Sequence, residues 1–250
     1  ELGSGIDLTL FSAVPAGSGL GTSSILGSAI IKCLSRIVGL EVKQEDLFNQ
    51  TLYMEQLMTT GGGWQDQIGG IIGGVKLIQT EPGLVQIPNI SWTDLKPKLN
   101  SSLFLLYYTG YRRMAKGILK HIVGKYLDRD EVTIRTINEL KRMSIEMKKY
   151  LDHRDIEAFG KGIAKVWEMN KILDPGTTNK DIESIIDKIA HLIHGAKLLG
   201  AGGGGFLFIV TKGTKQSQKV INILTNNPPN DKARFFDFQV DTDGLICNVL

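Results

Sequence analysis

One glycine-rich loop near the start of the chain constrains its fold and chemistry more than any other stretch. The loop reads Pro15-Ala16-Gly17-Ser18-Gly19-Leu20-Gly21-Thr22-Ser23-Ser24. Glycines let a backbone adopt dihedral angles that other residues avoid, so a ligand can approach it closely. A helix N-terminus carries a partial positive charge and unpaired N–H groups, which bind anions. The loop therefore predicts a phosphate site, and the alternative is a glycine-containing turn with a Ser/Thr helix cap.

The flanking patterns place this loop between a strand and a helix. Apolar and polar residues alternate over 6–14, which predicts a strand. Apolar residues recur at helical spacing over 24–38, and Gly39 ends that run as a C-cap. The loop lacks both the lysine of a Walker A sequence and the third glycine of a dinucleotide-binding fingerprint. Backbone N–H groups and hydroxyls would therefore hold the anion.

The rest of the chain predicts an α+β protein. A helix is expected over 44–58, followed by a hairpin of strands 75–80 and 84–87 and a domain boundary near 92–100. Further strands are expected over 103–109 and 205–211, with a terminal pair at 234–240 and 245–249. Further helices are expected over 112–127, 130–151, 155–172, 179–194 and 214–225.

Composition argues against several classes of partner. The net charge is +3 and the basic residues are dispersed, so no nucleic-acid surface is expected. No apolar run reaches the roughly 18 residues that span a bilayer, and the N-terminus lacks a signal-peptide pattern. Cys33 and Cys247 give no disulfide framework and fit a reducing compartment. We therefore expect a cytoplasmic protein without a nucleic-acid or membrane partner.

Two carboxylates are candidates for phosphoryl-transfer chemistry. Asp66 follows a triple glycine and lies between two glutamines, in a segment with little else to bury. It could orient or deprotonate a substrate hydroxyl, and the alternative role is a helix N-cap. Glu55 lies on the expected second helix and could supply an oxygen to Mg²⁺. A solvated helix residue would fit the position of Glu55 as well.

A second glycine-rich run, 200–205, leads into an expected strand. Its flanks are apolar, unlike those of a flexible linker, so we expect it to pack closely against another loop. His191 and His194 lie three positions apart on an expected helix. They would be a metal pair only with a third ligand, and the sequence shows none.

These motifs resemble those of the GHMP small-molecule kinases, such as galactokinase, homoserine kinase, mevalonate kinase and phosphomevalonate kinase. The loop 15–24 resembles their Pro-x-x-x-Gly-Leu-Gly-Ser-Ser signature, and the run 200–206 resembles their third, glycine-rich motif. The segment 61–67, Gly-Gly-Gly-Trp-Gln-Asp-Gln, is similar to the fucokinase version of the family's Gly-Gly-x-x-Asp-Gln segment. The resemblance covers the whole chain and is closest to the kinase part of bifunctional fucokinase/fucose-1-phosphate guanylyltransferases.

The resemblance implies a GHMP kinase fold with two lobes. Residues 1–97 would form a ribosomal protein S5 domain 2-like, ATP-binding N-terminal lobe, truncated at its start, and residues 98–250 a ferredoxin-like α+β C-terminal lobe. The family's first motif, which contacts the sugar, precedes the second and is absent from this sequence. We therefore expect little or no sugar phosphorylation by this chain alone. The resemblance also implies fusion to an upstream guanylyltransferase domain.

The resemblance further implies an ATP- and Mg²⁺-dependent kinase that phosphorylates the anomeric hydroxyl of L-fucose. The alternatives are a kinase of another sugar, such as a manno-heptose phosphate, and a non-catalytic nucleotide or sugar binder. Asp66 would be the catalytic base or hydroxyl-orienting acid, and Ser23 and Glu55 would hold the metal. The implied ATP-binding residues are Pro15, Gly17, Ser18, Gly19, Leu20, Gly21, Thr22, Ser23, Ser24, Gly202 and Gly203. The implied sugar-binding residues are Gly62, Gly63, Gln65 and Tyr111.

Overall fold

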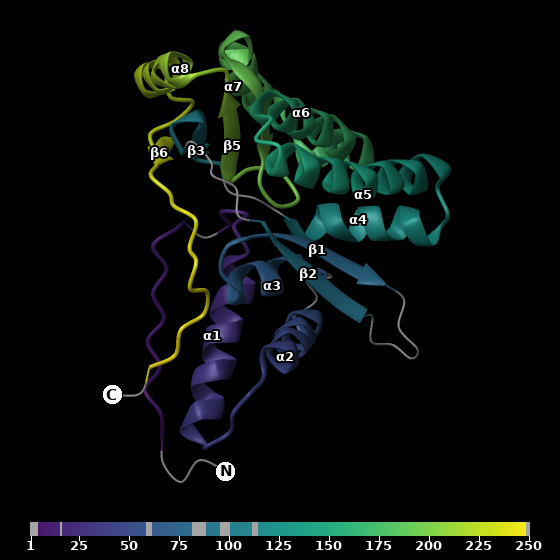
Figure 1. Ribbon diagram of the computed structural model, residues 1–250, viewed down its shortest axis with the longest axis vertical. Coiled ribbons are helices and arrows are strands. Elements are labelled where there is room, and N and C mark those ends of the chain that lie inside the picture. The colour runs from purple at the N-terminus through teal and green to yellow at the C-terminus, as the bar shows by residue number, and fades with distance from the viewer. Residues whose placement is uncertain are drawn as a thin grey trace. The chain divides into compact units, whose positions relative to one another are not determined.

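The computed structural model describes residues 5–15, 17–58, 62–81, 89–95, 101–111 and 115–248. The described residues form two compact units. The first unit comprises those of Glu1–Ala16, Gly21–Gly74 and Asp241–Leu250, and the second comprises those of Gly17–Leu20 and Val75–Val240. Figure 1 labels the helices and strands of each unit along the chain. The expected lobes, 1–97 and 98–250, do not coincide with these units and stay a prediction.

Three helices build the first unit: α1 (Thr22–Ile37), α2 (Gln44–Leu57) and α3 (Gln65–Ile71). The helices expected over 24–38 and 44–58 are thus confirmed, and Gly39 follows α1 with a φ of 73°. Helix α1 packs against α2 through small residues. A Cβ added at Gly27 would lie 3.2 Å from the Met54 sulfur, and the Ser28 and Thr51 hydroxyls are 2.9 Å apart.

Both ends of the sequence were expected to form strands, and these predictions are wrong over the described residues. Residues 5–15 contain no strand, and the apolar side chains of Ile6, Leu8 and Leu10 are exposed. An extended segment becomes a strand only when another strand pairs with its backbone groups. Residues 245–248 likewise contain no strand, although the Leu245 N–H donates to the Ile71 carbonyl over 3.0 Å.

The second unit begins with an antiparallel hairpin of β1 (Val75–Glu81) and β2 (Asn89–Leu95). The hairpin was expected, but its second strand begins at Asn89. The range expected for that strand, 84–87, lies outside the described residues. The boundary expected near 92–100 therefore starts inside a strand, because Trp92 pairs with Ile78.

A four-stranded antiparallel sheet is the centre of the second unit. Its order is β4-β5-β3-β6, and the strands are β3 (Phe104–Tyr108), β4 (Ile193–Leu198), β5 (Phe206–Thr211) and β6 (Arg234–Phe236). The strands expected over 103–109 and 205–211 are confirmed, as is the α+β class. The prediction that 234–240 pairs with 245–249 is wrong, because β6 pairs with β3.

The helices of the second unit follow the predicted periodicity, with one exception. They are α4 (Ala115–Leu127), α5 (Glu131–Asp152), α6 (Ile156–Leu173), α7 (Lys180–Ile189) and α8 (Thr214–Asn226), with short 3₁₀ turns η1 (Ser101–Leu103), η2 (Pro175–Thr177) and η3 (Ala190–Leu192). The helix expected over 179–194 ends early, because its last residues enter β4. Pairing with β5 outweighs the local pattern there. His191 and His194 therefore do not share a helix.

Alternation along β5 divides the core of this unit between two sheet faces. Leu207 and Ile209 belong to a cluster with Ile185 of α7 and Val220 of α8. Val210 belongs to the other cluster, with Phe159 of α6. Successive strand residues point to opposite faces, so the sheet is covered on both sides. In the part of the chain that the structure describes, no helix is both long and apolar enough to cross a bilayer.

Candidate active site

In the first unit, the glycine loop enters α1 without a side-chain cap. The N-cap residue is Gly21, with a φ of 66°, and no side-chain hydrogen bond caps the helix. Gly17 and Gly19 also have positive φ angles, of 74° and 80°. The alternative of a Ser/Thr cap is therefore wrong. The loop uses its glycines for left-handed backbone, and the partial positive charge of a helix N-terminus favours an anion.

Glu55 is buried beneath the first turn of this helix. Only 4% of the residue is exposed. Its Oε1 accepts hydrogen bonds from the Ser23 and Ser24 hydroxyls over 2.9 and 2.7 Å, and its Oε2 accepts one from the Gln67 amide. The alternative of a solvated helix residue is wrong. A buried carboxylate with three donors is held in one orientation, with its oxygens at the start of α1.

Ser23 and Glu55 bring together two oxygens of the kind that magnesium binds. Magnesium prefers hydroxyl, carboxylate, water and phosphate oxygens. The 2.9 Å between Ser23 Oγ and Glu55 Oε1 is that of a hydrogen bond, so the pair fits a magnesium site by the chemistry of its oxygens alone. Among the residues described here, no group of three or more His, Cys, Asp and Glu could hold a metal ion. Phosphate oxygens and water would have to complete the shell.

Asp66 lies against the backbone of Gly21. It is the second residue of α3, whose N-cap is Trp64, so the alternative of an Asp N-cap is wrong. A Cβ added at Gly21 would lie 3.1 Å from the Asp66 Cβ and 3.4 Å from its Oδ1. Asp66 is exposed, unlike Glu55. This places an accessible carboxylate beside the residue at which α1 begins.

The residues before Asp66 that were expected to bind the sugar are accessible to a ligand. An added Cβ would meet no atom within 4 Å at either Gly62 or Gly63, and Gln65 is exposed. The Gly62 carbonyl accepts a hydrogen bond from the Gln56 amide over 2.9 Å, which ties this segment to α2. The space beside Gly62 and Gly63 could admit a ligand.

In the second unit, the start of the glycine loop packs against the second glycine-rich run. The Phe206 N–H donates to the Ser18 carbonyl over 3.1 Å. A Cβ added at Gly205 would lie 2.8 Å from the Ser18 carbonyl carbon and nearer still to its oxygen. The expected close packing against another loop is confirmed. Only glycine fits at 205, so the contact between the two loops depends on that residue.

Backbone hydrogen bonds to Thr177 and Tyr111 hold the same run within this unit. The Gly203 N–H donates to the Thr177 carbonyl over 2.6 Å, and the Gly205 N–H donates to the Tyr111 carbonyl over 3.0 Å. Burial raises the pKa of the Tyr111 phenol, opposed by a hydrogen bond from Asn230 and reinforced by the Asp181 carboxylate. Tyr111 thus supports the glycine run through its backbone, and its phenol lies with Asn230 and Asp181.

Two supporting residues were missed from the sequence. Gln67 orients Glu55, and the Thr109 hydroxyl donates to the Gly205 carbonyl over 2.8 Å. The position of Gln67 offered a signal, because Gln67, Ile68 and Ile71 form the buried side of α3. A glutamine on a buried helix face needs a polar partner. Thr109, at the end of a strand, offered no comparable signal.

An apolar cavity also lies in the second unit. Its volume is about 510 Å³, and it is lined by side chains that include Leu20, Leu106, Met147 and Phe208. Ser144 and Lys197 are its polar lining residues. A sugar needs several convergent hydrogen-bond partners, so this cavity is a poor sugar site.

Comparison with known proteins identifies the family. The model of the GHMP kinases N terminal domain matches residues 1–74, and that of the GHMP kinases C terminal domain matches residues 147–230. The two matches contain the glycine loop, Glu55, Asp66 and the second glycine-rich run. The chain belongs to the GHMP kinase family.

Two relatives point to one branch of that family. The chain is 42% identical to the L-fucokinase/L-fucose-1-P guanylyltransferase of Bacteroides fragilis over 249 residues, which cover 98% of this chain and 26% of the relative. It is 34% identical to the bifunctional fucokinase/GDP-fucose pyrophosphorylase of Arabidopsis thaliana, over 86% of this chain and 21% of the relative. The chain therefore spans about a quarter of the length of these relatives.

The fold is also similar to that of a solved structure. A D-glycero-D-manno-heptose 1-phosphate kinase from Bacteroides thetaiotaomicron superposes with a TM-score of 0.69, over 94% of this chain and 64% of that chain. The sequence identity is 22%, so the likeness concerns the fold alone.

Proposed function

We propose that this chain is the kinase part of an enzyme that transfers the γ-phosphoryl group of ATP to the anomeric hydroxyl of L-fucose. The products are fucose 1-phosphate and ADP. The single observation that carries the chemistry is the position of Asp66 against Gly21, where an exposed carboxylate lies beside the N-terminus of α1. The choice of L-fucose rests on the two fucokinase relatives, at 42% and 34% identity.

The ATP phosphates would bind along the glycine loop. Its left-handed glycines allow successive backbone N–H groups to converge on an anion, and the N-terminus of α1 adds a partial positive charge. The ATP-binding residues would be Pro15, Gly17, Ser18, Gly19, Leu20, Gly21, Thr22, Ser23 and Ser24, supported by Gly202 and Gly203. Ser23 and Glu55 would hold Mg²⁺, which when bound neutralises part of the phosphate charge.

Asp66 would act on the sugar. Its carboxylate would accept a hydrogen bond from the anomeric hydroxyl, orient that oxygen for in-line attack and take its proton as the new P–O bond forms. Gly62, Gly63 and Gln65, which lie near Asp66 in the sequence, would bind the remaining sugar hydroxyls. The exposure of Asp66 suits this role, because a base must reach the substrate.

The alternatives predict different behaviour. A kinase of a manno-heptose phosphate shares the fold, but the D-glycero-alpha-D-manno-heptose 7-phosphate kinase of Campylobacter jejuni is 29% identical over 84% of this chain, against 42% over 98% for the Bacteroides fragilis fucokinase. A non-catalytic binder would not need Ser23, Glu55 and Asp66 together, and the first two bring two possible metal ligands into contact. Both fucokinase relatives are described as bifunctional, so we propose that this kinase is joined to a nucleotidyltransferase activity.

A sugar panel tests the proposal. The longest natural protein that contains this sequence would be incubated with ATP and Mg²⁺ and, separately, with L-fucose, D-galactose and manno-heptose phosphates. We expect ADP release with L-fucose at least tenfold faster than with the others, and a product whose phosphorus NMR spectrum shows phosphate on the anomeric carbon. Faster turnover of a heptose phosphate, or no sugar-dependent ADP release, would contradict the proposal.

A further inference from the structure

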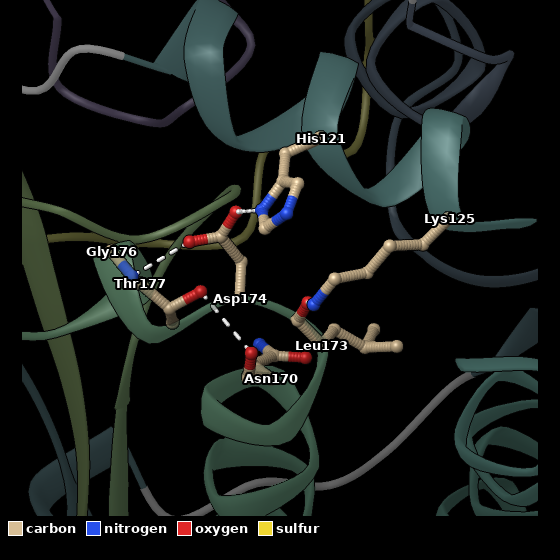
Figure 2. Close-up of polar contacts among 7 residues, drawn as sticks. All are labelled: His121, Lys125, Asn170, Leu173, Asp174, Gly176 and Thr177. Carbon is tan, nitrogen blue, oxygen red and sulfur yellow. Dashed lines mark hydrogen bonds and ion pairs between the residues drawn. The ribbon is translucent and has the colours of Figure 1, made fainter. Parts of the chain in front are cut away.

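A hydrogen-bonded pair of side chains, His121 and Asp174, lies behind the second glycine-rich run. His121 belongs to α4, and Asp174 directly follows α6. The distance between His121 Nδ1 and Asp174 Oδ2 is 2.6 Å. A carboxylate accepts, so the ring donates through its Nδ1–H. Figure 2 shows the imidazole pointing to the carboxylate from α4, with Gly176 on the other oxygen.

Asp174 fixes the short turn η2. Its Oδ1 accepts the Gly176 N–H over 2.6 Å, and its backbone carbonyl accepts the Thr177 N–H over 3.0 Å. The Thr177 hydroxyl donates to the Asn170 carbonyl over 3.2 Å (Figure 2). Asp174 is almost fully buried, with 8% of its side chain exposed. A buried carboxylate with two donors holds the turn in one orientation.

The turn η2 also fixes the position of the second glycine-rich run. The Thr177 carbonyl accepts the Gly203 N–H over 2.6 Å. The approach at Gly202 is so close that an added Cβ would lie 2.9 Å from the Thr177 Cα. Ile118 of α4 lies 3.5 Å from the position of a Cβ at Gly203. Helix α4, the turn η2 and the glycine-rich run therefore pack as one cluster.

The other end of the run holds the start of the glycine loop. Gly205 is bonded to Thr109 and Tyr111, and the next residue, Phe206, donates its N–H to the Ser18 carbonyl. A displacement of Gly203 would be transmitted over two residues to this contact. The path from His121 to Ser18 consists of hydrogen bonds and close backbone contacts within the second unit.

We propose that His121 is a positioning residue for the nucleotide: its hydrogen bond to Asp174 sets the position of the glycine-rich run, and through it that of Ser18 in the phosphate loop. This inference rests on the proposed ATP-binding function of that loop. The imidazole is about half exposed, at 52%, so its replacement removes little buried area. Loss of the donor should therefore leave the protein folded and weaken ATP binding.

The test compares three variants of the chain. His121→Phe keeps an aromatic ring but removes the donor, whereas His121→Asn restores an N–H near the position of Nδ1. His153→Phe is the matched control, because His153 Nδ1 contacts the Lys149 carbonyl, four residues earlier in the chain, over 2.7 Å. ATP affinity is measured by calorimetry, and folding by thermal unfolding followed by circular dichroism.

We expect His121→Phe to raise the dissociation constant for ATP about 5- to 10-fold, as befits one hydrogen bond to a charged group. His121→Asn and His153→Phe should stay within about twofold of the wild type in ATP affinity and within about 2 °C of it in unfolding temperature, whereas His121→Phe should unfold about 3–6 °C lower, because it removes a donor from a buried carboxylate. In the longest natural protein, His121→Phe should raise the KM for ATP and leave that for the sugar unchanged.

Three outcomes separate this inference from the proposed function. If the wild type binds no ATP, both are overturned. If the wild type and His121→Phe bind ATP equally well, only the positioning role is overturned. An equal loss of ATP affinity in His121→Phe and His121→Asn would assign His121 a merely structural role and would also overturn the inference.

Discussion

Replacing Gly205 by alanine should loosen the contact between the two glycine loops, and its cost can be worked from the geometry. Gly205 has a φ of 91°, and an added Cβ would lie 2.8 Å from the Ser18 carbonyl carbon. A non-glycine residue in left-handed backbone costs about 1–2 kcal/mol. Overpacking against a backbone atom costs a further 1–3 kcal/mol or so. We therefore predict that Gly205→Ala lowers the free energy of unfolding by about 3 kcal/mol.

Two other glycines separate strain from steric clash. Gly203 also has a positive φ, of 76°, but an added Cβ would meet its nearest atoms at 3.4 and 3.5 Å. Gly203→Ala should cost only the strain, about 1 kcal/mol. Gly117 lies in α4 with no atom within 4 Å of an added Cβ, so Gly117→Ala should stabilise the protein by about 0.5–1 kcal/mol through helix propensity.

Urea unfolding followed by circular dichroism measures these differences, provided that the slope of the free energy with denaturant is the same in all variants. Gly205→Ala should also weaken ATP binding, because the added methyl group displaces the Ser18 carbonyl. Equal losses of stability in Gly205→Ala and Gly203→Ala would refute the reasoning, since the steric contribution would then be absent.

Two further substitutions test buried polar groups. Glu55→Gln should raise the Mg²⁺ concentration for half-maximal turnover at least tenfold. It should change the free energy of unfolding by less than about 1 kcal/mol, because the Gln67 Oε1, which has no hydrogen-bond partner among the described residues, can accept from the new amide. An unchanged Mg²⁺ requirement would remove Glu55 from the metal site. Tyr107→Phe should stabilise the protein by about 1 kcal/mol, since the Tyr107 hydroxyl is buried without a partner. Burial, aided by Tyr111, raises the pKa of Tyr107 to about 12. The wild type should therefore lose stability as the pH rises from 10 towards 12, and Tyr107→Phe should lose less. Identical alkaline unfolding profiles of the two proteins would contradict this.

The sequence patterns predicted the local structure where local rules decide it. The glycines at 17, 19 and 21 adopt the positive φ angles that their positions suggested. The boundaries of α5 and α6 follow from their caps, because Asp130 and Asp155 accept hydrogen bonds from N–H groups in the first turns.

The misses have tertiary causes. Residues 193 and 194 were expected to end a helix, but pairing with β5 makes them the start of strand β4. The segment 6–14 has strand periodicity, but periodicity does not supply a pairing partner. These elements depend on contacts between residues far apart in the chain.

The candidate site divides in the same way. Asp66, Ser23 and Glu55 could be named from the sequence, because their residue types suit phosphoryl transfer and the motifs resemble a known family. The burial of Glu55 and the hydrogen bond that it accepts from Gln67 could not be predicted from the sequence, since both depend on how α2 and α3 pack on α1. The path from His121 to Ser18 joins residues about a hundred positions apart, and no local pattern connects them.

Substituting Asp66 tests the central claim most directly. Asp66→Asn keeps the size of the side chain and removes its capacity to take a proton. In the longest natural protein that contains this sequence, we predict that L-fucose phosphorylation falls at least about 100-fold, the contribution of a general base, while the dissociation constant for ATP stays within about threefold of the wild type. Turnover near the wild-type rate would contradict the proposed mechanism.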